Sequence, residues 1–171
     1  MLLERFYPDE ETTDAYGIDY ESLYRRGYRG IIFDIDNTLV PHGAPADRKA
    51  KKLFRRLQSI GFATVLLSNN KEPRVKSFAE NVGSAYLYKA GKPSARGYQN
   101  AMQKMDIGAE QTVFVGDQLF TDVWGAKRLG IRTFLVKPIH PKEEIQIVLK
   151  RKLEAIVLYF YHKNRKKRVS C

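Results

Sequence analysis

Two aspartates, Asp34 and Asp36, stand two residues apart at the end of a run of large apolar residues, 31–33. If that run is a buried strand of a parallel sheet, both carboxylates lie where such sheets bind ligands, beyond the carboxyl ends of their strands. Taken alone, the pair also has an ordinary structural explanation, in which Asp34 caps backbone amides of a turn and Asp36 is solvated. The ends of the neighbouring strands decide between the two interpretations.

Each of the next three predicted strands also ends in polar side chains. In chain order these are Ser68 with Asn69, then Lys92 after a short strand, then Asp117 with Asp122 five residues on. Chance supplies any one of these groups, but it seldom supplies all of them in order. The sequence therefore predicts a polar site at one edge of a sheet.

The predicted groups suit transfer of a phosphoryl group to a carboxylate. A phosphate monoester is a dianion, so its repulsion from an aspartate must be neutralised, and Mg²⁺ with oxygen ligands does this. Asp34 and Asp117 can hold the metal, and Lys92 supplies a compact positive charge. A covalent aspartyl-phosphate then divides one difficult hydrolysis into two easier steps.

Further residues complete the predicted site. Ser68 and Asn69 can donate hydrogen bonds to phosphoryl oxygens, and we place Thr38 with them as a phosphate-binding residue. Asp36 can protonate the leaving group in the first step and activate water in the second.

Each assignment has a plainer alternative. Lys92 would be a surface lysine before a proline, Ser68 a buried hydroxyl bonded to backbone, and Asp122 a helix cap. His42, in a loop rich in proline and glycine, either faces the mouth of the site or is simply exposed.

The elements that must position these side chains alternate along the chain. Apolar runs predict strands over 30–33, 62–67, 85–88, 112–115 and 132–136, and periodic or capped segments predict helices over 47–59, 73–81, 94–105 and 120–129. Strands that are apolar throughout are typical of a parallel sheet covered on both faces. We therefore expect an α/β fold with a three-layer, Rossmann-like parallel sheet and helices on both faces.

The chain of 171 residues is the length of one domain with a proper core. We divide it into an N-terminal arm (1–28), an α/β core (29–140) and a C-terminal amphipathic helix with a basic tail (141–171). The arm is rich in acids and turns, so we expect it to be irregular apart from a short helix near residues 19–25.

The four motifs in this order make the sequence similar to the haloacid dehalogenase (HAD) superfamily of phosphatases. The resemblance implies an Mg²⁺-dependent phosphatase with a nucleophile, an acid/base, a phosphate-binding hydroxyl, a lysine and metal ligands. The nucleophile would be Asp34, and the acid/base would be Asp36, which also offers the metal its backbone carbonyl. The phosphate-binding hydroxyl would be Ser68 and the lysine Lys92. Asp117 would be a direct metal ligand. Asp122 would bind the metal through water or orient Lys92.

The gaps between motifs hold no cap domain, because residues 39–64 and 70–91 suffice only for a loop, a helix and a strand each. The sequence thus resembles the capless type IIIA group, whose open sites often serve macromolecular or membrane-borne substrates. A finer resemblance, carried by Asp-Asn-Thr-Leu-Val and the preceding Tyr-Arg-Gly, is to the bacterial YqeG-type group and to phosphatidylglycerophosphate phosphatases. It implies a lipid head group as substrate and phosphatidylglycerol as product.

The net charge of +11 favours anionic partners. Near the C-terminus, a basic cluster at 165–168 follows apolar residues at helical spacing: Ile145, Val148, Leu149, Leu153, Ile156, Val157 and Phe160. Such a helix either lies on an anionic membrane face or packs its apolar stripe on the sheet. The basic outer face of helix 48–56 is likewise either an ordinary solvated surface or a second site of contact with an anionic surface.

The start of the sequence lacks the basic and apolar regions of a secretory signal. Its one cysteine, Cys171, excludes a disulfide framework, and the longest apolar run, 155–161, is too short to span a bilayer. We therefore expect a cytoplasmic protein, peripheral at the inner face of the membrane.

Two other functions stay open. One is a phosphatase for a nucleotide, a sugar phosphate or a nucleic-acid end, although the sequence has no pattern of exposed aromatics for stacking bases. The other is a non-catalytic protein that uses the fold to dock a membrane or a partner. The sequence leaves the oligomeric state open.

Overall fold

The computed structural model describes residues 2–140 and 145–169, with side chains described for 3–140 and 150–166. Within them, six parallel strands form one sheet in the order β1-β6-β5-β2-β3-β4. The strands are β1 (Glu10–Thr12), β2 (Gly30–Phe33), β3 (Ala63–Leu67), β4 (Ala85–Leu87), β5 (Thr112–Gly116) and β6 (Arg132–Val136). The predicted parallel α/β sheet is confirmed.

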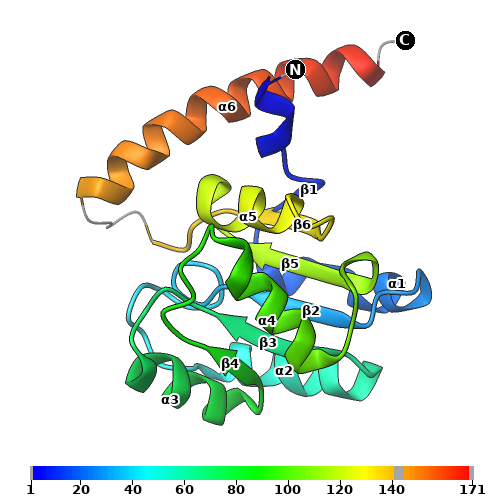
Figure 1. The fold of residues 1–171 in the computed structure, drawn as a ribbon, viewed down its shortest axis with the longest axis vertical. Helices are drawn as coiled ribbons and strands as arrows, with labels where there is room; N and C mark the ends of the chain where they lie inside the picture. The colour runs from blue at the N-terminus through cyan, green and yellow to red at the C-terminus, as the bar shows by residue number, and fades with distance from the viewer. Residues whose placement is uncertain (1, 141–144, 170–171) are drawn as a thin grey trace.

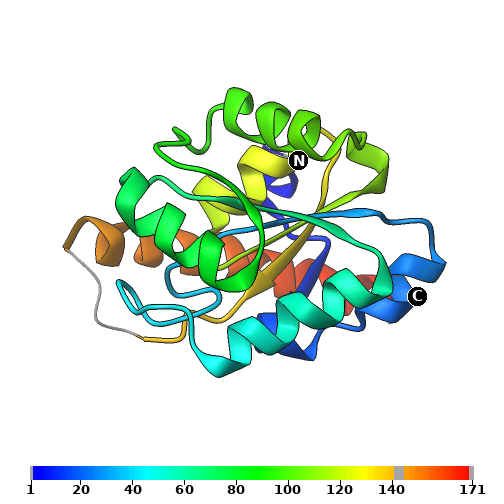
Figure 2. The ribbon, with the colours of Figure 1, turned by 90° about the horizontal axis from the view of Figure 1, so that it is seen from below.

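Helices cover both faces of this sheet (Figures 1 and 2). One face carries α1 (Tyr20–Arg25), α2 (Arg48–Ile60) and α3 (Glu72–Val82), and the other carries α4 (Ala95–Met105) and α5 (Trp124–Lys127). Because side chains alternate along a strand, Ile31 and Phe33 enter the core under α1–α3, while Ile32 enters the core under α4 and α5. Burial on both sides explains why β2 is apolar throughout.

Short turns of helix complete the fold. They are η1 (Leu2–Phe6), η2 (Ala15–Gly17), η3 (Ala109–Gln111) and the π-helical turn η4 (Leu119–Val123). The segment 39–64 holds only a loop, α2 and the start of β3, and the segment 70–91 holds only α3, β4 and loops. No further domain is therefore inserted between the motifs.

The helix boundaries follow from identifiable capping groups. The Asp47 carboxylate accepts a hydrogen bond from the Ala50 N–H at 2.7 Å, and Gly61 ends α2 with a φ of 111°, a conformation that favours glycine. Pro73 stands in the first turn of α3. Ser94 precedes α4, but its hydroxyl makes no capping hydrogen bond there.

The N-terminal segment contributes to the sheet, which the sequence did not predict. Strand β1 pairs with β6, with Glu10 opposite Phe134, and the Asp9 carboxylate accepts the Thr133 N–H at 2.8 Å. Residues 10–12 are polar because an edge strand needs no apolar run, and edge charges discourage pairing with other chains. The short helix expected near residues 19–25 is present as α1.

The C-terminal helix α6 (Ile145–Val169) runs beside η1 (Figure 1). Its inner face buries Val157 and Tyr161, and the Tyr161 ring lies 5.1 Å from that of Tyr7. Its outer face exposes Leu153, Ile156, Tyr159 and Phe160 by 53%, 56%, 62% and 40%.

The predicted apolar stripe is therefore divided between two faces of α6. Val157 packs inward, whereas Leu153, Ile156 and Phe160 face outward, so packing of the whole stripe on the sheet is wrong for these three. The side chains of Ile145, Val148, Leu149, Lys167 and Arg168, and Cys171 as a whole, lie outside the described residues. In the part of the chain that the structure describes, no helix combines the length and apolarity needed to cross a bilayer.

Candidate active site

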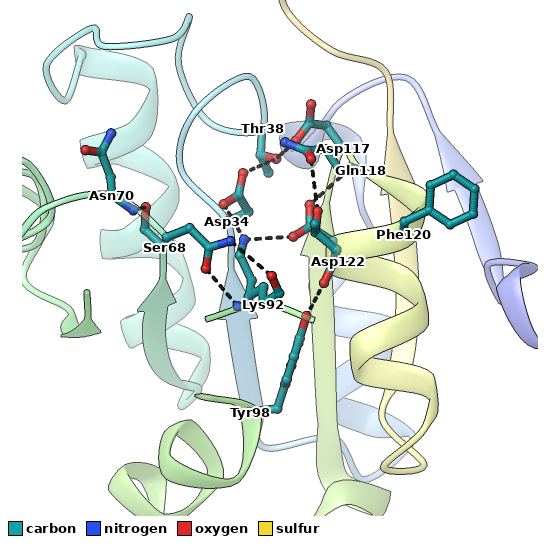
Figure 3. Close-up of polar contacts among 12 residues, drawn as sticks. Asp34, Thr38, Ser68, Asn70, Lys92, Tyr98, Asp117, Gln118, Phe120 and Asp122 are labelled. Atoms are coloured by element: carbon teal, nitrogen blue, oxygen red, sulfur yellow. Dashed lines mark hydrogen bonds and ion pairs between the residues drawn. The ribbon is translucent and has the colours of Figure 1, made fainter. Parts of the chain in front are cut away.

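The polar residues at the strand ends converge on one buried lysine (Figure 3). The Lys92 Nζ lies 2.6 Å from Asp34 Oδ1 and 2.7 Å from Asp122 Oδ1. Asp34 follows β2, Lys92 comes from the loop after β4, and Asp122 belongs to η4. All three are buried, so each charge depends on the others for compensation.

Gly116 allows Asp122 to reach this position. A Cβ at Gly116 would lie 2.5 Å from Asp122 Oδ2, so any side chain there would displace the carboxylate. The Gln118 N–H also donates to Asp122 Oδ2, at 3.1 Å, which fixes the carboxylate from the backbone (Figure 3). The sequence pair Gly-Asp at 116–117 thus positions two acids, not one.

Burial sets the protonation behaviour of the lysine and the acids. Burial raises the pKa of Asp34 to about 6, with Lys92 opposing the rise and Asp122 adding to it. Burial also raises the pKa of Asp117 well above its usual range, and Asp34 and Asp122 raise it further. For Lys92, burial is outweighed by the two adjacent carboxylates, which raise its pKa and keep it an ammonium.

Three carboxylates form a cluster that suits a hard cation. Asp34, Asp117 and Asp122 each offer one oxygen, and these oxygens lie within 4.8 Å of one another. Their repulsion in a buried site, together with oxygen-only donors, fits Mg²⁺. Among the described residues, the Asp36 side chain does not belong to this cluster; its backbone carbonyl as a metal ligand stays a prediction.

Thr38 lies between two members of the carboxylate cluster. Its Oγ1 is 3.3 Å from Asp34 Oδ2 and 3.2 Å from Asp117 Oδ1. The hydroxyl has one proton, so it donates to one of these two carboxylates at a time. Its predicted contact with substrate phosphate stays a prediction.

Asp36 occupies a different environment from Asp34. Its Oδ1 accepts the Gly43 N–H at 2.8 Å and the Arg74 guanidinium at 2.9 Å, and its Oδ2 lies 3.4 Å from the Asn70 amide. Burial alone would raise the pKa of Asp36, but the Gly43 N–H and Arg74 outweigh it and lower the pKa. Two carboxylates two residues apart thus have opposite pKa shifts, and the lowered pKa of Asp36 favours its ionised form, which can accept a proton.

Ser68 and Asn69 both line the catalytic cavity, and Asn69 also holds the loop beside it. Ser68 is buried, and its hydroxyl accepts the Asn70 N–H at 3.1 Å. The Asn69 side chain bonds both backbone groups of Lys92, accepting its N–H at 2.8 Å and donating to its carbonyl at 3.2 Å. Asn69 therefore holds the loop that carries Lys92, and its predicted contact with phosphate stays a prediction.

A cavity of about 350 Å³ opens over these residues. It is lined by Asp34, Asp36, Asn37, His42, Ser68, Asn69, Asn70, Lys92, Gln118 and Thr121. His42 thus faces the mouth of the site, which was one of its two predicted positions. The predicted nucleophile, acid/base, lysine and phosphate-binding serine share one cavity.

Sequence reasoning missed Arg151, which reaches the site from α6. Its guanidinium is ion-paired with the Asp117 carboxylate and donates to the Asp117 backbone carbonyl at 2.5 Å and to Glu154 at 3.1 Å. The buried Glu154 in turn accepts the Leu119 N–H at 2.8 Å. Spacing of Arg151 and Glu154 at i and i+3 was the available signal for a pair on one helix face.

Comparison with known proteins agrees with this geometry. The model of the haloacid dehalogenase-like hydrolases matches residues 43–130, which include Ser68, Lys92, Asp117 and Asp122. The Bacillus subtilis protein described as probable phosphatase YqeG is 37% identical over 159 residues and 92% of each chain.

Two more distant matches extend the comparison. The Arabidopsis thaliana phosphatidylglycerophosphate phosphatase 1, chloroplastic/mitochondrial, is 27% identical over 88% of this chain, which spans only 47% of that protein. The crystal structure of a HAD phosphatase from Thermococcus onnurineus matches 68% of this chain and 90% of its own, with a TM-score of 0.52 at 13% identity, and so supports the fold.

The four motifs, the buried Asp34–Lys92–Asp122 arrangement and the 37% identity to the Bacillus protein lead to the same answer. The chain belongs to the haloacid dehalogenase-like hydrolase family, as a phosphatase.

Proposed function

We propose that the protein is an Mg²⁺-dependent phosphatase that converts phosphatidylglycerophosphate to phosphatidylglycerol through an aspartyl-phosphate on Asp34. The observation that carries the mechanism is the position of Lys92, 2.6 Å from Asp34 Oδ1 inside a cluster of buried carboxylates. A carboxylate in that position is held as an anion beside a fixed positive charge. It is thereby prepared to attack a phosphorus atom.

In the first step, an Asp34 oxygen attacks phosphorus and the bond from phosphorus to the leaving-group oxygen breaks. Asp36, at the same cavity, gives a proton to that oxygen, and it must bind this proton before the step because its contacts with Arg74 and the Gly43 N–H lower its pKa. In the second step, Asp36 takes a proton from water, the water oxygen attacks phosphorus, and the bond to Asp34 breaks. The products are the alcohol and inorganic phosphate, and both aspartates return to their starting states.

The remaining side chains bind and orient the reactants. Lys92 offers positive charge to the phosphoryl group, and the Ser68 hydroxyl at the same cavity is available to donate to it. Asp34, Asp117 and Asp122 would hold Mg²⁺, with the backbone carbonyl of Asp36 as a further ligand. When bound, the metal supplies positive charge that offsets the repulsion between the phosphate dianion and the carboxylate.

The choice of a lipid substrate has separate support. The plant relative is described as a phosphatidylglycerophosphate phosphatase, and the alignment covers 88% of this chain. The absence of an inserted domain in residues 39–64 and 70–91 leaves the site open to a head group at a surface. The runner-up substrates are nucleotides, sugar phosphates and nucleic-acid ends, and a docking protein without catalysis is the alternative of another class.

A substrate panel tests the proposal. Phosphate release would be measured from phosphatidylglycerophosphate in mixed micelles, a nucleoside monophosphate, a hexose phosphate and a 5′-phosphorylated oligonucleotide, each with Mg²⁺ and with EDTA. We expect the highest kcat/KM for the lipid and loss of all activity in EDTA. Preference for a soluble ester would favour the runner-up, and no release from any substrate would favour the docking protein.

We further propose that the outer face of α6 contacts the anionic inner face of the membrane, with the protein otherwise in the cytoplasm. Leu153, Ile156 and Phe160 are exposed on that face, and Lys150, Lys152 and Lys163 are exposed on the same helix. Apolar side chains with lysines around them are typical of helices that lie in a bilayer interface.

Ile156→Glu should weaken binding to vesicles of phosphatidylglycerol and phosphatidylcholine by about tenfold, because a buried isoleucine side chain is worth roughly 1.5 kcal/mol or more. Co-sedimentation at low and high salt measures this, and binding should fall with salt because charges are screened over about 10 Å at 0.1 M. Tyr88→Glu, a change at a residue that is 42% exposed after β4, is the matched control. Equal binding by Ile156→Glu and wild type would remove α6 from the membrane contact.

A further inference from the structure

A second cleft lies beside the active site, along the inner side of α6. Its volume is about 580 Å³, and its lining comes from β1, the end of β6 with the loop that follows, and α6. Asp117 belongs both to this lining and to the carboxylate cluster. The cleft and the catalytic site therefore share a wall.

The lining combines apolar walls with charged side chains of both signs. Leu135, Ala155 and Leu158 contribute apolar surface. Glu11, Asp117 and Glu154 add carboxylates, two of which, Asp117 and Glu154, are ion-paired with Arg151. Glu11 lies 2.7 Å from His162 Nε2. Lys137 adds an exposed ammonium. Within the described part of the chain, no hydrogen bond or ion pair occupies the Lys137 Nζ. The apolar side chains and the ammonium of Lys137 suit an amphiphile whose anionic group reaches Lys137.

We infer that this cleft binds the leaving group of the substrate, and specifically a second anionic group with the start of an apolar chain. The inference rests on the proposed function, since a phosphatidylglycerophosphate carries its phosphate monoester on a glycerol that is joined to a phosphodiester. With the monoester at Asp34, the phosphodiester is one short glycerol away. Lys137 then faces the phosphodiester, and Ala155 and Leu158 contact the first part of the apolar chain.

The cleft gives an open site a means of selection. Soluble phosphate monoesters that lack a second anion leave the cleft unfilled, so they gain only the interactions at the catalytic cavity. The lipid gains both sets of interactions. Helix α6 thus performs for this chain the selection that a separate domain would perform over a closed site.

Binding of a product-like probe tests the cleft without catalysis. Dihexanoyl phosphatidylglycerol has the phosphodiester and short apolar chains but no monoester, and its Kd would be measured by titration calorimetry below its micelle-forming concentration. We expect Lys137→Gln to weaken binding about fivefold, the upper end for an exposed ion pair. Ala155→Trp, which fills the cleft, should abolish binding.

Matched controls separate the cleft from the rest of the surface. Lys104→Gln removes an exposed lysine from α4, and Gln103→Trp puts the same indole on the exposed side of α4. Both should bind the probe as wild type does. Failure of wild type to bind, or equal binding by Lys137→Gln, Ala155→Trp and the controls, would overturn the inference.

A second measurement distinguishes failure of the cleft from failure of the proposed function. It is the ratio of kcat/KM for dihexanoyl phosphatidylglycerophosphate to that for p-nitrophenyl phosphate, which should fall about fivefold in Lys137→Gln. Hydrolysis of both esters with an unchanged ratio in both cleft variants would refute the cleft and keep the phosphatase. Hydrolysis of neither ester, with probe binding that depends on Lys137 and Ala155, would refute the function and keep the cleft.

Discussion

Asp34→Asn is expected to lower phosphatase turnover about 10,000-fold or more, which is the scale of losses when a nucleophile is removed. An amide is a poor nucleophile and cannot form the acyl phosphate. Substitution also takes one negative charge from the cluster of Asp34, Asp117 and Asp122, so Mg²⁺ should bind more weakly. Steady-state release of p-nitrophenol measures the first effect, and calorimetric titration with Mg²⁺ measures the second.

The fold of this variant should persist, because Lys92 keeps its 2.7 Å contact with Asp122. Thermal unfolding would verify that before any rate is interpreted. Asp106→Asn, at the exposed end of α4 where a left-handed residue accepts asparagine well, is the matched control and should keep wild-type rates. Turnover by Asp34→Asn above the level of contaminants would exclude Asp34 as the nucleophile.

Asp36→Asn should have a smaller and different effect, a loss of about 100- to 10,000-fold in steady-state turnover. p-Nitrophenolate leaves with little need of a proton, so the first step should survive while hydrolysis of the aspartyl-phosphate slows. The phosphoenzyme should accumulate and be visible as a phosphoryl adduct in intact-mass spectrometry. Asp34→Asn should show no adduct under the same conditions.

A substitution at Arg74 provides a second test of the role of Asp36. Its guanidinium lies 2.9 Å from Asp36 Oδ1 and, with the Gly43 N–H, overcomes the effect of burial on the Asp36 pKa. Arg74→Gln should therefore alter the rate of dephosphorylation while leaving the adduct on Asp34 able to form. A wild-type rate in Asp36→Asn, with no adduct, would show that proton transfer occurs elsewhere.

The convergence of Asp34, Ser68, Lys92 and Asp117 was predictable because it follows from the fold. Parallel strands place their carboxyl ends at one edge, so polar residues after successive apolar runs must approach one another. The strands were visible because burial on both faces makes them apolar throughout. Strand β1 lacks that signal, since an edge strand with the sequence Glu-Glu-Thr looks like a loop.

Contacts between distant segments were beyond sequence reasoning. Arg151 lies 34 residues after Asp117, and Arg74 lies 38 residues after Asp36. Residue type also left roles undecided: the amide of Asn69 suits a phosphate as well as the Lys92 backbone that it contacts. Helical spacing marked an apolar stripe on α6, but it could not tell that Val157 packs inward while Ile156 faces outward.

The contact of α6 with the loop around Asp117 has a thermodynamic consequence. Glu154 accepts the Leu119 N–H, and Arg151 holds Asp117, so the seating of α6 and the state of the carboxylate cluster depend on each other. Free-energy coupling between two sites is reciprocal. If binding of a bilayer to the outer face of α6 changes the affinity of the carboxylate cluster for Mg²⁺, then Mg²⁺ must change the affinity of the protein for the bilayer by the same factor.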